Sequence, residues 1–74
     1  MDWNIAEANW KQFKGTVRAR WGRLTDEHLD AIGGKRDQLL IKIQEVYEVS
    51  KPDAQRDLKT FEERNKDYKP KKAS

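Results

Sequence analysis

Residues 9–25 read NWKQFKGTVRARWGRLT and contain two of the chain's three tryptophans, one phenylalanine and five cations. On a helical wheel of about 100° per residue, the apolar residues of this segment and its N-terminal flank fall within an arc of roughly 80°. These residues are Ala6, Trp10, Phe13, Val17, Trp21 and Leu24. The arc predicts an amphipathic first helix that ends near Gly22 and buries its aromatic face in a core.

A line of charged side chains runs beside this apolar stripe and does not interleave with the tryptophans. It contains Glu7, Lys11, Lys14 and Arg18 at spacings of four, three and four residues. Charged side chains of this kind usually form a solvated helix face, which is the interpretation that the sequence favours. The alternative that stays open is a phosphate-facing stripe made of the three cations, for nucleic acid.

Gly15 lies in the middle of the predicted first helix, nearly opposite the apolar stripe. Glycine in a helix interior costs about 1 kcal/mol relative to alanine. Close packing in this core does not explain a glycine on the outer face. Gly15 therefore indicates a kink, a bend or the close approach of a partner.

Capping residues predict the remaining helices. Thr25 is a suitable N-cap for a short second helix, and Gly33 with Gly34 ends it. A third helix is expected at about 35–48, and a fourth runs from the cap Ser50 to about Asn65. The apolar residues expected to face inward from these three helices are Leu29, Ile32, Leu39, Leu40, Ile43, Val46, Tyr47, Ala54, Leu58 and Phe61.

The patterns together predict an all-α fold of four helices over residues 1–65, followed by a basic tail at 66–74. The tail sequence, KDYKPKKAS, has too few apolar residues to bury, so we expect it to be mobile. Ile41 points away from the buried arc of the third helix, so this apolar side chain lies on a face that we expect to be exposed to solvent.

The segment AIGGKRDQ, residues 31–38, resembles a phosphate-binding hairpin, because a helix and two glycines precede a helix that opens with Lys35 and Arg36. Cations in a first helical turn oppose the helix dipole by about 0.3–1 kcal/mol each, which is consistent with a bound anion. The sequence favours the simpler alternative that Asp37 or Asp30 neutralises them. The glycine pattern itself is a weak signal.

Residue content argues against catalysis and against a cofactor. The chain has 74 residues, no cysteine and one histidine, so it lacks the members of a nucleophile–base set. Three clustered acids, Asp26, Glu27 and Asp30, lack the loop spacing of a calcium site, so no metal is expected. No apolar run or signal peptide indicates a membrane, and a cytoplasmic protein is expected.

Four segments carry a family resemblance: NWKQFKG (9–15), WGRLTDEHL (21–29), GKRDQL (34–39) and KIQEVY (42–47). Together they resemble the CsbD-like family of small bacterial stress proteins. The resemblance implies a cytoplasmic helical bundle, two hairpins packed crosswise as in sterile-alpha-motif-like folds, and production under general stress control. It implies no activity, cofactor or catalytic residue. The chain departs from the family at Ala8, Ile41 and Glu48, where glycine is common.

These observations lead to a main functional hypothesis and two alternatives. The main one is a non-enzymatic stress-response protein that binds a macromolecule of unknown identity. The first alternative is weak nucleic-acid binding, for which a net charge of +3 is modest. Its expected contacts are Lys11, Lys14, Arg18, Lys35 and Arg36. The second alternative is a self-associating or partner-docking module that uses Gly15 and Ile41, although packing of Ile41 against a neighbouring loop is favoured.

Overall fold

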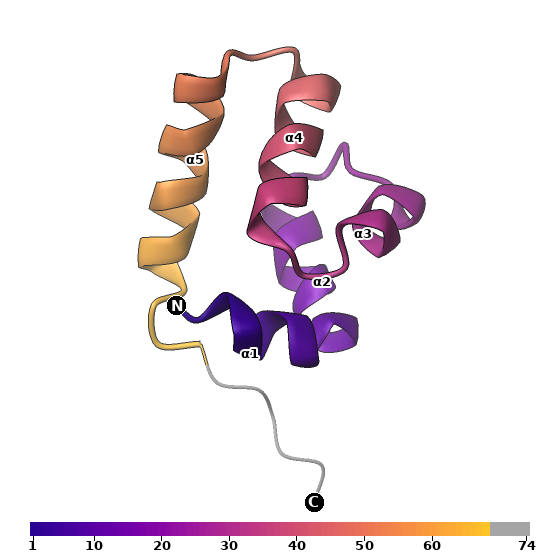
Figure 1. Ribbon diagram of the computed structural model, residues 1–74, viewed down its shortest axis with the longest axis vertical. Helices are drawn as coiled ribbons and strands as arrows, with labels where there is room; N and C mark the ends of the chain where they lie inside the picture. The colour runs from indigo at the N-terminus through magenta and orange to yellow at the C-terminus, as the bar shows by residue number, and fades with distance from the viewer. Residues whose placement is uncertain (69–74) are drawn as a thin grey trace, which may run out of the picture.

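The computed structural model describes residues 1–68, which form helices and turns without a strand (Figure 1). The all-α prediction is confirmed for this part of the chain. The helices are α1 (Trp3–Ala8), α2 (Trp10–Arg20), α3 (Asp26–Ile32), α4 (Arg36–Tyr47) and α5 (Lys51–Arg64).

Residues 1–68 form five helices where the sequence predicts four, because the first predicted helix is broken at Asn9. The backbone of Asn9 has φ −119° and ψ 32°, outside helical values. Its side-chain amide donates to the carbonyl of Ile5 at 3.0 Å, a local hydrogen bond of the type that competes with helix propagation. Gly15 lies within α2 and does not mark the break.

The predicted caps are confirmed. The hydroxyl of Thr25 accepts the backbone N–H of His28 at 3.1 Å, and that of Ser50 accepts the N–H of Asp53 at 3.4 Å. Gly33 ends α3 in the left-handed conformation with φ +58°. Since these signals are local, the helix boundaries that depend on them agree closely with the sequence.

Helices α4 and α5 lie side by side and antiparallel, and α3 packs against α4 (Figure 1). Helix α1 lies across the end of this pair at which α4 begins and α5 ends. The crosswise arrangement of two hairpins, similar to sterile-alpha-motif folds, stays a prediction.

The core is built around aromatic rings. The ring of Phe13 lies 6.1 Å from that of Trp3, 5.8 Å from that of Phe61 and 4.5 Å from that of Tyr68. Aromatic side chains bury about 150–250 Å² each, which compensates for the small apolar content of a short chain. The buried residues are Ala6, Phe13, Val17, Trp21, Leu24, Leu29, Ile32, Leu39, Leu40, Ile43, Ala54, Leu58 and Phe61.

Trp10 is the one member of the predicted stripe that is not fully buried. The other five are at most 1% exposed, whereas Trp10 is half-buried at the edge of the core. Its indole N–H donates to the carbonyl of Leu29 at 2.8 Å. A buried indole needs such an acceptor, and this one lies at the edge of the core, on α3.

Part of the predicted tail packs on the fold. Tyr68 is half-buried against Phe13, so the segment at 66–68 continues beyond α5 over the aromatic core. Residues 69–74 lie outside the described residues, so the expected mobility of the tail at 66–74 stays a prediction.

Candidate functional site

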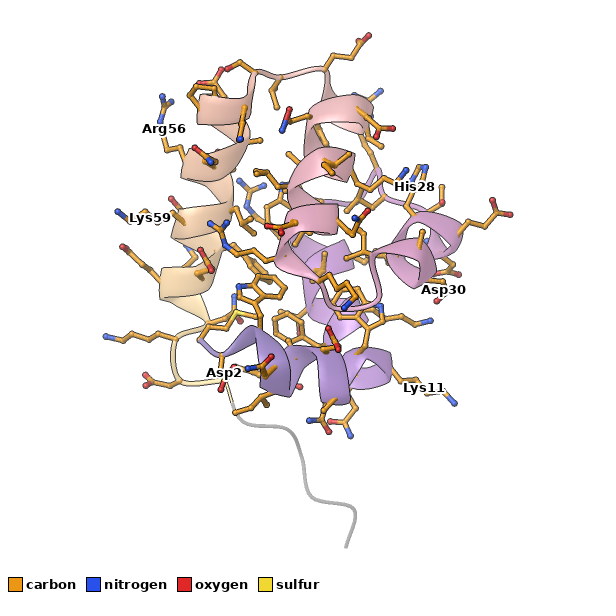
Figure 2. All side chains as sticks on the ribbon, viewed as in Figure 1. Asp2, Lys11, His28, Asp30, Arg56 and Lys59 are labelled. Atoms are coloured by element: carbon orange, nitrogen blue, oxygen red, sulfur yellow. The ribbon has the colours of Figure 1, made fainter. Side chains whose placement is uncertain are left out.

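The cations predicted on α2 face acids of α3. The Nζ atom of Lys14 lies 3.3 Å from Oδ1 of Asp30, and Nη1 of Arg18 lies 3.0 Å from Oδ1 of Asp26. The two cations are four residues apart on α2, and the two acids are four residues apart on α3. Each cation therefore lies opposite one acid. Lys11 has no ion pair within residues 1–68 and projects away from the fold (Figure 2).

The cations that open α4 also have carboxylate partners, which differ from those expected. Lys35 Nζ lies 3.3 Å from Glu7 Oε2 of α1. Arg36 makes a two-point contact with Glu62 of α5, through Nε at 3.1 Å and Nη2 at 3.3 Å. The sequence favoured Asp37 or Asp30 as partners. The structure instead uses acids that are distant in the chain.

Glu62 joins three helices. Besides Arg36, it accepts the indole N–H of Trp3 at 2.7 Å. Partial burial by itself raises the pKa of Glu62. The hydrogen bonds from Arg36 and Trp3, with the positive charge of Arg36, outweigh burial and hold this pKa below its usual value of 4.5. The carboxylate is therefore held in its charged form.

Gly34 allows α1 to approach the turn between α3 and α4. It has φ +86°, and a Cβ atom placed there would lie 2.5 Å from Cα of Glu7. Beside this contact is an open pocket of about 320 Å³ between α1 and the start of α4. The pocket is lined by Trp3, Asn4, Glu7 and residues 34–38. The two cations in its lining, Lys35 and Arg36, are already paired with Glu7 and Glu62.

His28 has a structural role at the start of α3. Its Nδ1 accepts the backbone N–H of Thr25 at 3.2 Å, which completes a reciprocal capping arrangement with the Thr25 hydroxyl. Within residues 1–68, no group of three or more His, Asp or Glu side chains is arranged to hold a metal ion.

The two residues predicted as partner contacts are both exposed. A Cβ atom on Gly15 would meet no atom within 4 Å, so its outer face is open. Ile41 is 44% exposed, more than the other exposed large apolar residue, Ile5, at 39%. The packing of Ile41 against a neighbouring loop would have covered it, so the solvent-facing alternative is the one observed.

The sequence reasoning noticed Ile41 but missed the acids around it. Asp37 precedes and Glu45 follows Ile41 by four residues, which places these three side chains on one face of α4, and Glu48 caps the C-terminal end of that helix. All four residues are exposed. We call this set the acidic α4 face. The same spacing, read from the sequence, would have identified it.

The acidic α4 face receives no cation from another helix of the described structure. Glu45 has one ion pair, with Lys42 of its own helix at 3.7 Å, and no ion pair involves Asp37 or Glu48 within residues 1–68. Glu48 also ends α4 in the left-handed conformation at φ +53°, where glycine is usual. An acid there is further opposed by the helix dipole.

Charge is divided between residues 1–68 and the last six residues of the sequence. The chain has 16 cations and 13 acids, and three of its lysines lie in KPKKAS at 69–74, which has no acid. Residues 1–68 therefore hold 13 of each and have no net formal charge. The net charge of +3 equals the contribution of the last six residues.

The matching family model is that of the CsbD-like proteins, which aligns with residues 4–56. The chain belongs to the CsbD-like family. This confirms the resemblance seen in the four sequence segments. In the part of the chain that the structure describes, no helix has the length and apolar character needed to cross a bilayer.

Relatives in several bacteria cover most of this chain. A UPF0337 protein of Nitrosomonas europaea is 48% identical over 61 residues, which are 82% of this chain and 65% of that relative. The UPF0337 protein YjbJ of an Escherichia coli strain is 48% identical over 69 residues, 93% of this chain and 99% of the relative. YjbJ of Salmonella typhimurium is 48% identical over 65 residues, 88% of this chain and 93% of the relative. These names state no ligand or reaction.

Proposed function

We propose that this CsbD-like protein is a non-enzymatic stress-response protein of the bacterial cytoplasm that acts by binding another protein. The observation that carries the proposal is the acidic α4 face, on which Ile41 is 44% exposed between acids that receive no cation from another helix of the described part. Protein contacts commonly have an apolar centre with a polar rim, and Ile41 among these acids offers a small centre of this kind.

The state of Glu62 argues against its use as a general acid. A general acid at neutral pH needs a raised pKa, whereas the pKa of Glu62 is lowered by Arg36 and Trp3. Both of its oxygens accept hydrogen bonds from these two partners. Glu62 therefore suits a structural role between helices.

A test uses a photo-crosslinking amino acid in place of Ile41 in bacteria under stress. The matched control carries it at Gln55, which is exposed on α5. We expect protein adducts from position 41 above those from position 55. Equal adduct yields at the two positions, or none at position 41, would contradict the proposal.

Nucleic-acid binding is the second candidate, and a specific observation supports it. Lys11 has no ion pair within residues 1–68, and three further lysines lie at 69–74. Binding of phosphate by Lys14, Arg18, Lys35 and Arg36 would require exchange of their present carboxylate partners. Any such binding should therefore be weak and salt-dependent.

Amide NMR titrations with duplex DNA and single-stranded RNA, at low and physiological salt, separate these candidates. Shifts at Lys11, Lys14, Arg18, Lys35 and Arg36 would favour nucleic acid. Shifts confined to residues 66–74 would indicate electrostatic contact by the tail alone.

A further inference from the structure

The acidic α4 face presents a row of negative charge about an apolar centre. Asp37 and Glu45 are eight residues apart on one helix face, which corresponds to about 12 Å along the axis. Glu48 continues the row at the C-terminal end of α4. A complementary ligand needs several cations within this length and an aliphatic portion to cover Ile41.

The chain itself contains a segment of this chemistry. Lys69, Lys71 and Lys72 lie within four residues, which span about 10 Å when extended. Lysine stems cover apolar surface while their ammonium groups remain in water, so they suit an isoleucine with acids on either side. The distribution of charge along the chain agrees with this pairing. Residues 1–68 have no net formal charge, and the net charge of +3 equals that of residues 69–74.

We propose that the acidic α4 face binds the Lys69–Lys72 segment of a second copy of this protein. The inference rests on the proposed function, because it identifies the bound protein as another CsbD-like chain. It also gives one explanation for the exposure of Ile41 and for acids that receive no cation from another described helix.

Chain length favours a second copy over the same chain. Glu48 lies at the end of α4 that leads into α5, whereas Tyr68 follows the opposite end of α5 (Figure 1). The 14 residues of α5 extend about 21 Å. Lys69 to Lys72 follow Tyr68 by one to four residues, at most about 14 Å. Contact of all three lysines with Glu45 and Glu48 of the same chain would therefore require a fully extended tail, which favours a second copy.

The tail of one copy would contact a different surface, the acidic α4 face, of the next copy. Such a heterologous contact builds rings or open chains, unless two copies exchange their tails reciprocally and form a closed dimer. Exposed charge pairs contribute little individually and are screened by salt. We expect weak association, with an association constant that falls about tenfold or more between 50 and 500 mM salt.

The test mixes two forms of the full-length chain at low salt. One is ¹⁵N-labelled and carries Lys69→Gln, Lys71→Gln and Lys72→Gln, and the other is unlabelled wild type. We expect amide shifts at residues 37–48 of the labelled form that grow with wild-type concentration and vanish at 500 mM salt. An unlabelled partner with the same three substitutions should give no shifts.

Two controls keep the result specific. An unlabelled partner with Lys11→Gln, Lys51→Gln and Lys59→Gln loses the same charge at exposed positions elsewhere and should still produce the shifts. A labelled form that also carries Asp37→Asn, Glu45→Gln and Glu48→Gln should lose them. Because the tail substitutions lie outside the five described helices, they test the proposal even if the α4 variant folds poorly.

Absence of shifts at residues 37–48 would overturn the second-copy proposal, as would equal shifts with the tail-substituted partner. Differences between wild type and the tail variant that do not depend on concentration would indicate the tail of the same chain and would also overturn it. Adducts of position 41 with a different protein, together with no shifts in the mixture, would refute the second copy and leave the proposed function standing.

Discussion

The indole N–H of Trp3 donates to Oε2 of Glu62 at 2.7 Å and thereby joins residues that are 59 positions apart in the chain. Arg36 contacts both oxygens of the same carboxylate. One acid on α5 thus holds α1 and the start of α4. This contact fixes the end of α4 from which the acidic α4 face begins.

Substitution of Glu62 by glutamine should destabilise the fold by about 1–2 kcal/mol, because Arg36 loses its charged partner in a half-buried site. Urea unfolding followed by circular dichroism measures the change. Glu63→Gln is the control, since Glu63 is exposed and has no ion pair within the described residues. It should change stability by less than about 0.5 kcal/mol. Equal effects of the two substitutions would refute the role of Glu62.

The lowered pKa of Glu62 predicts a specific pH dependence. A carboxyl whose pKa is lower in the folded state stabilises the protein above its unfolded pKa, near 4.5, and loses this contribution as pH falls through the folded value. The stability difference between wild type and Glu62→Gln should therefore shrink as pH falls from about 5 towards 3. Urea midpoints across this range test it. A difference that stays constant with pH would contradict the assignment.

Removal of the indole donor should raise the pKa of Glu62. In Trp3→Phe the ring stays near Phe13 but the hydrogen bond to Glu62 is lost, while that from Arg36 remains. Carboxyl ¹³C titration of the side chain measures the pKa in both forms. An unchanged value would show that Trp3 has no part in holding this charge.

Two glycine substitutions should have opposite effects. Gly34→Ala places a Cβ 2.5 Å from Cα of Glu7 at φ +86°, and should destabilise the protein by about 2–4 kcal/mol. Gly15→Ala lies in the interior of α2 with open space around it, and should stabilise by about 0.5–1 kcal/mol. Thermal unfolding of both variants provides the comparison. A loss of stability on Gly15→Ala would mean that this position has a packing role that the fold does not show.

The two tryptophans of the opening segment should differ in their contributions. Trp21 is 1% exposed, and its replacement by alanine should cost about 3–5 kcal/mol, enough to unfold a domain of this size. Trp10 is half-buried, so Trp10→Ala should cost less, although it also removes the hydrogen bond to Leu29. Equal losses in chemical denaturation would place Trp10 in the core after all.

Local signals account for the parts of the fold that the sequence predicts well. The caps at Thr25, Gly33 and Ser50 act through residues within four positions, and the helix boundaries near them agree with the structure. The break at Asn9 was not predicted, because the apolar period continues across it while the side chain of Asn9 bonds to the backbone of Ile5.

Long-range pairings explain what the sequence left undetermined about the candidate site. Lys35 and Arg36 were expected to pair with nearby Asp37 or Asp30, but their partners are Glu7 and Glu62, which the packing of α1 and α5 brings close. The acidic α4 face was accessible to sequence reasoning, since its spacing about Ile41 is helical. Only the structure shows that no other described helix covers its acids.

Protein binding by the acidic α4 face is the proposal on which the function of this chain rests. Its most direct test is an amide NMR spectrum of the labelled chain in clarified extract from stressed bacteria, recorded with and without nuclease treatment. We expect line broadening at residues 37–48 that survives nuclease and is lost in the variant with Asp37→Asn, Glu45→Gln and Glu48→Gln. Broadening at Lys11, Lys14 and Arg18 that disappears with nuclease, and none on α4, would contradict it.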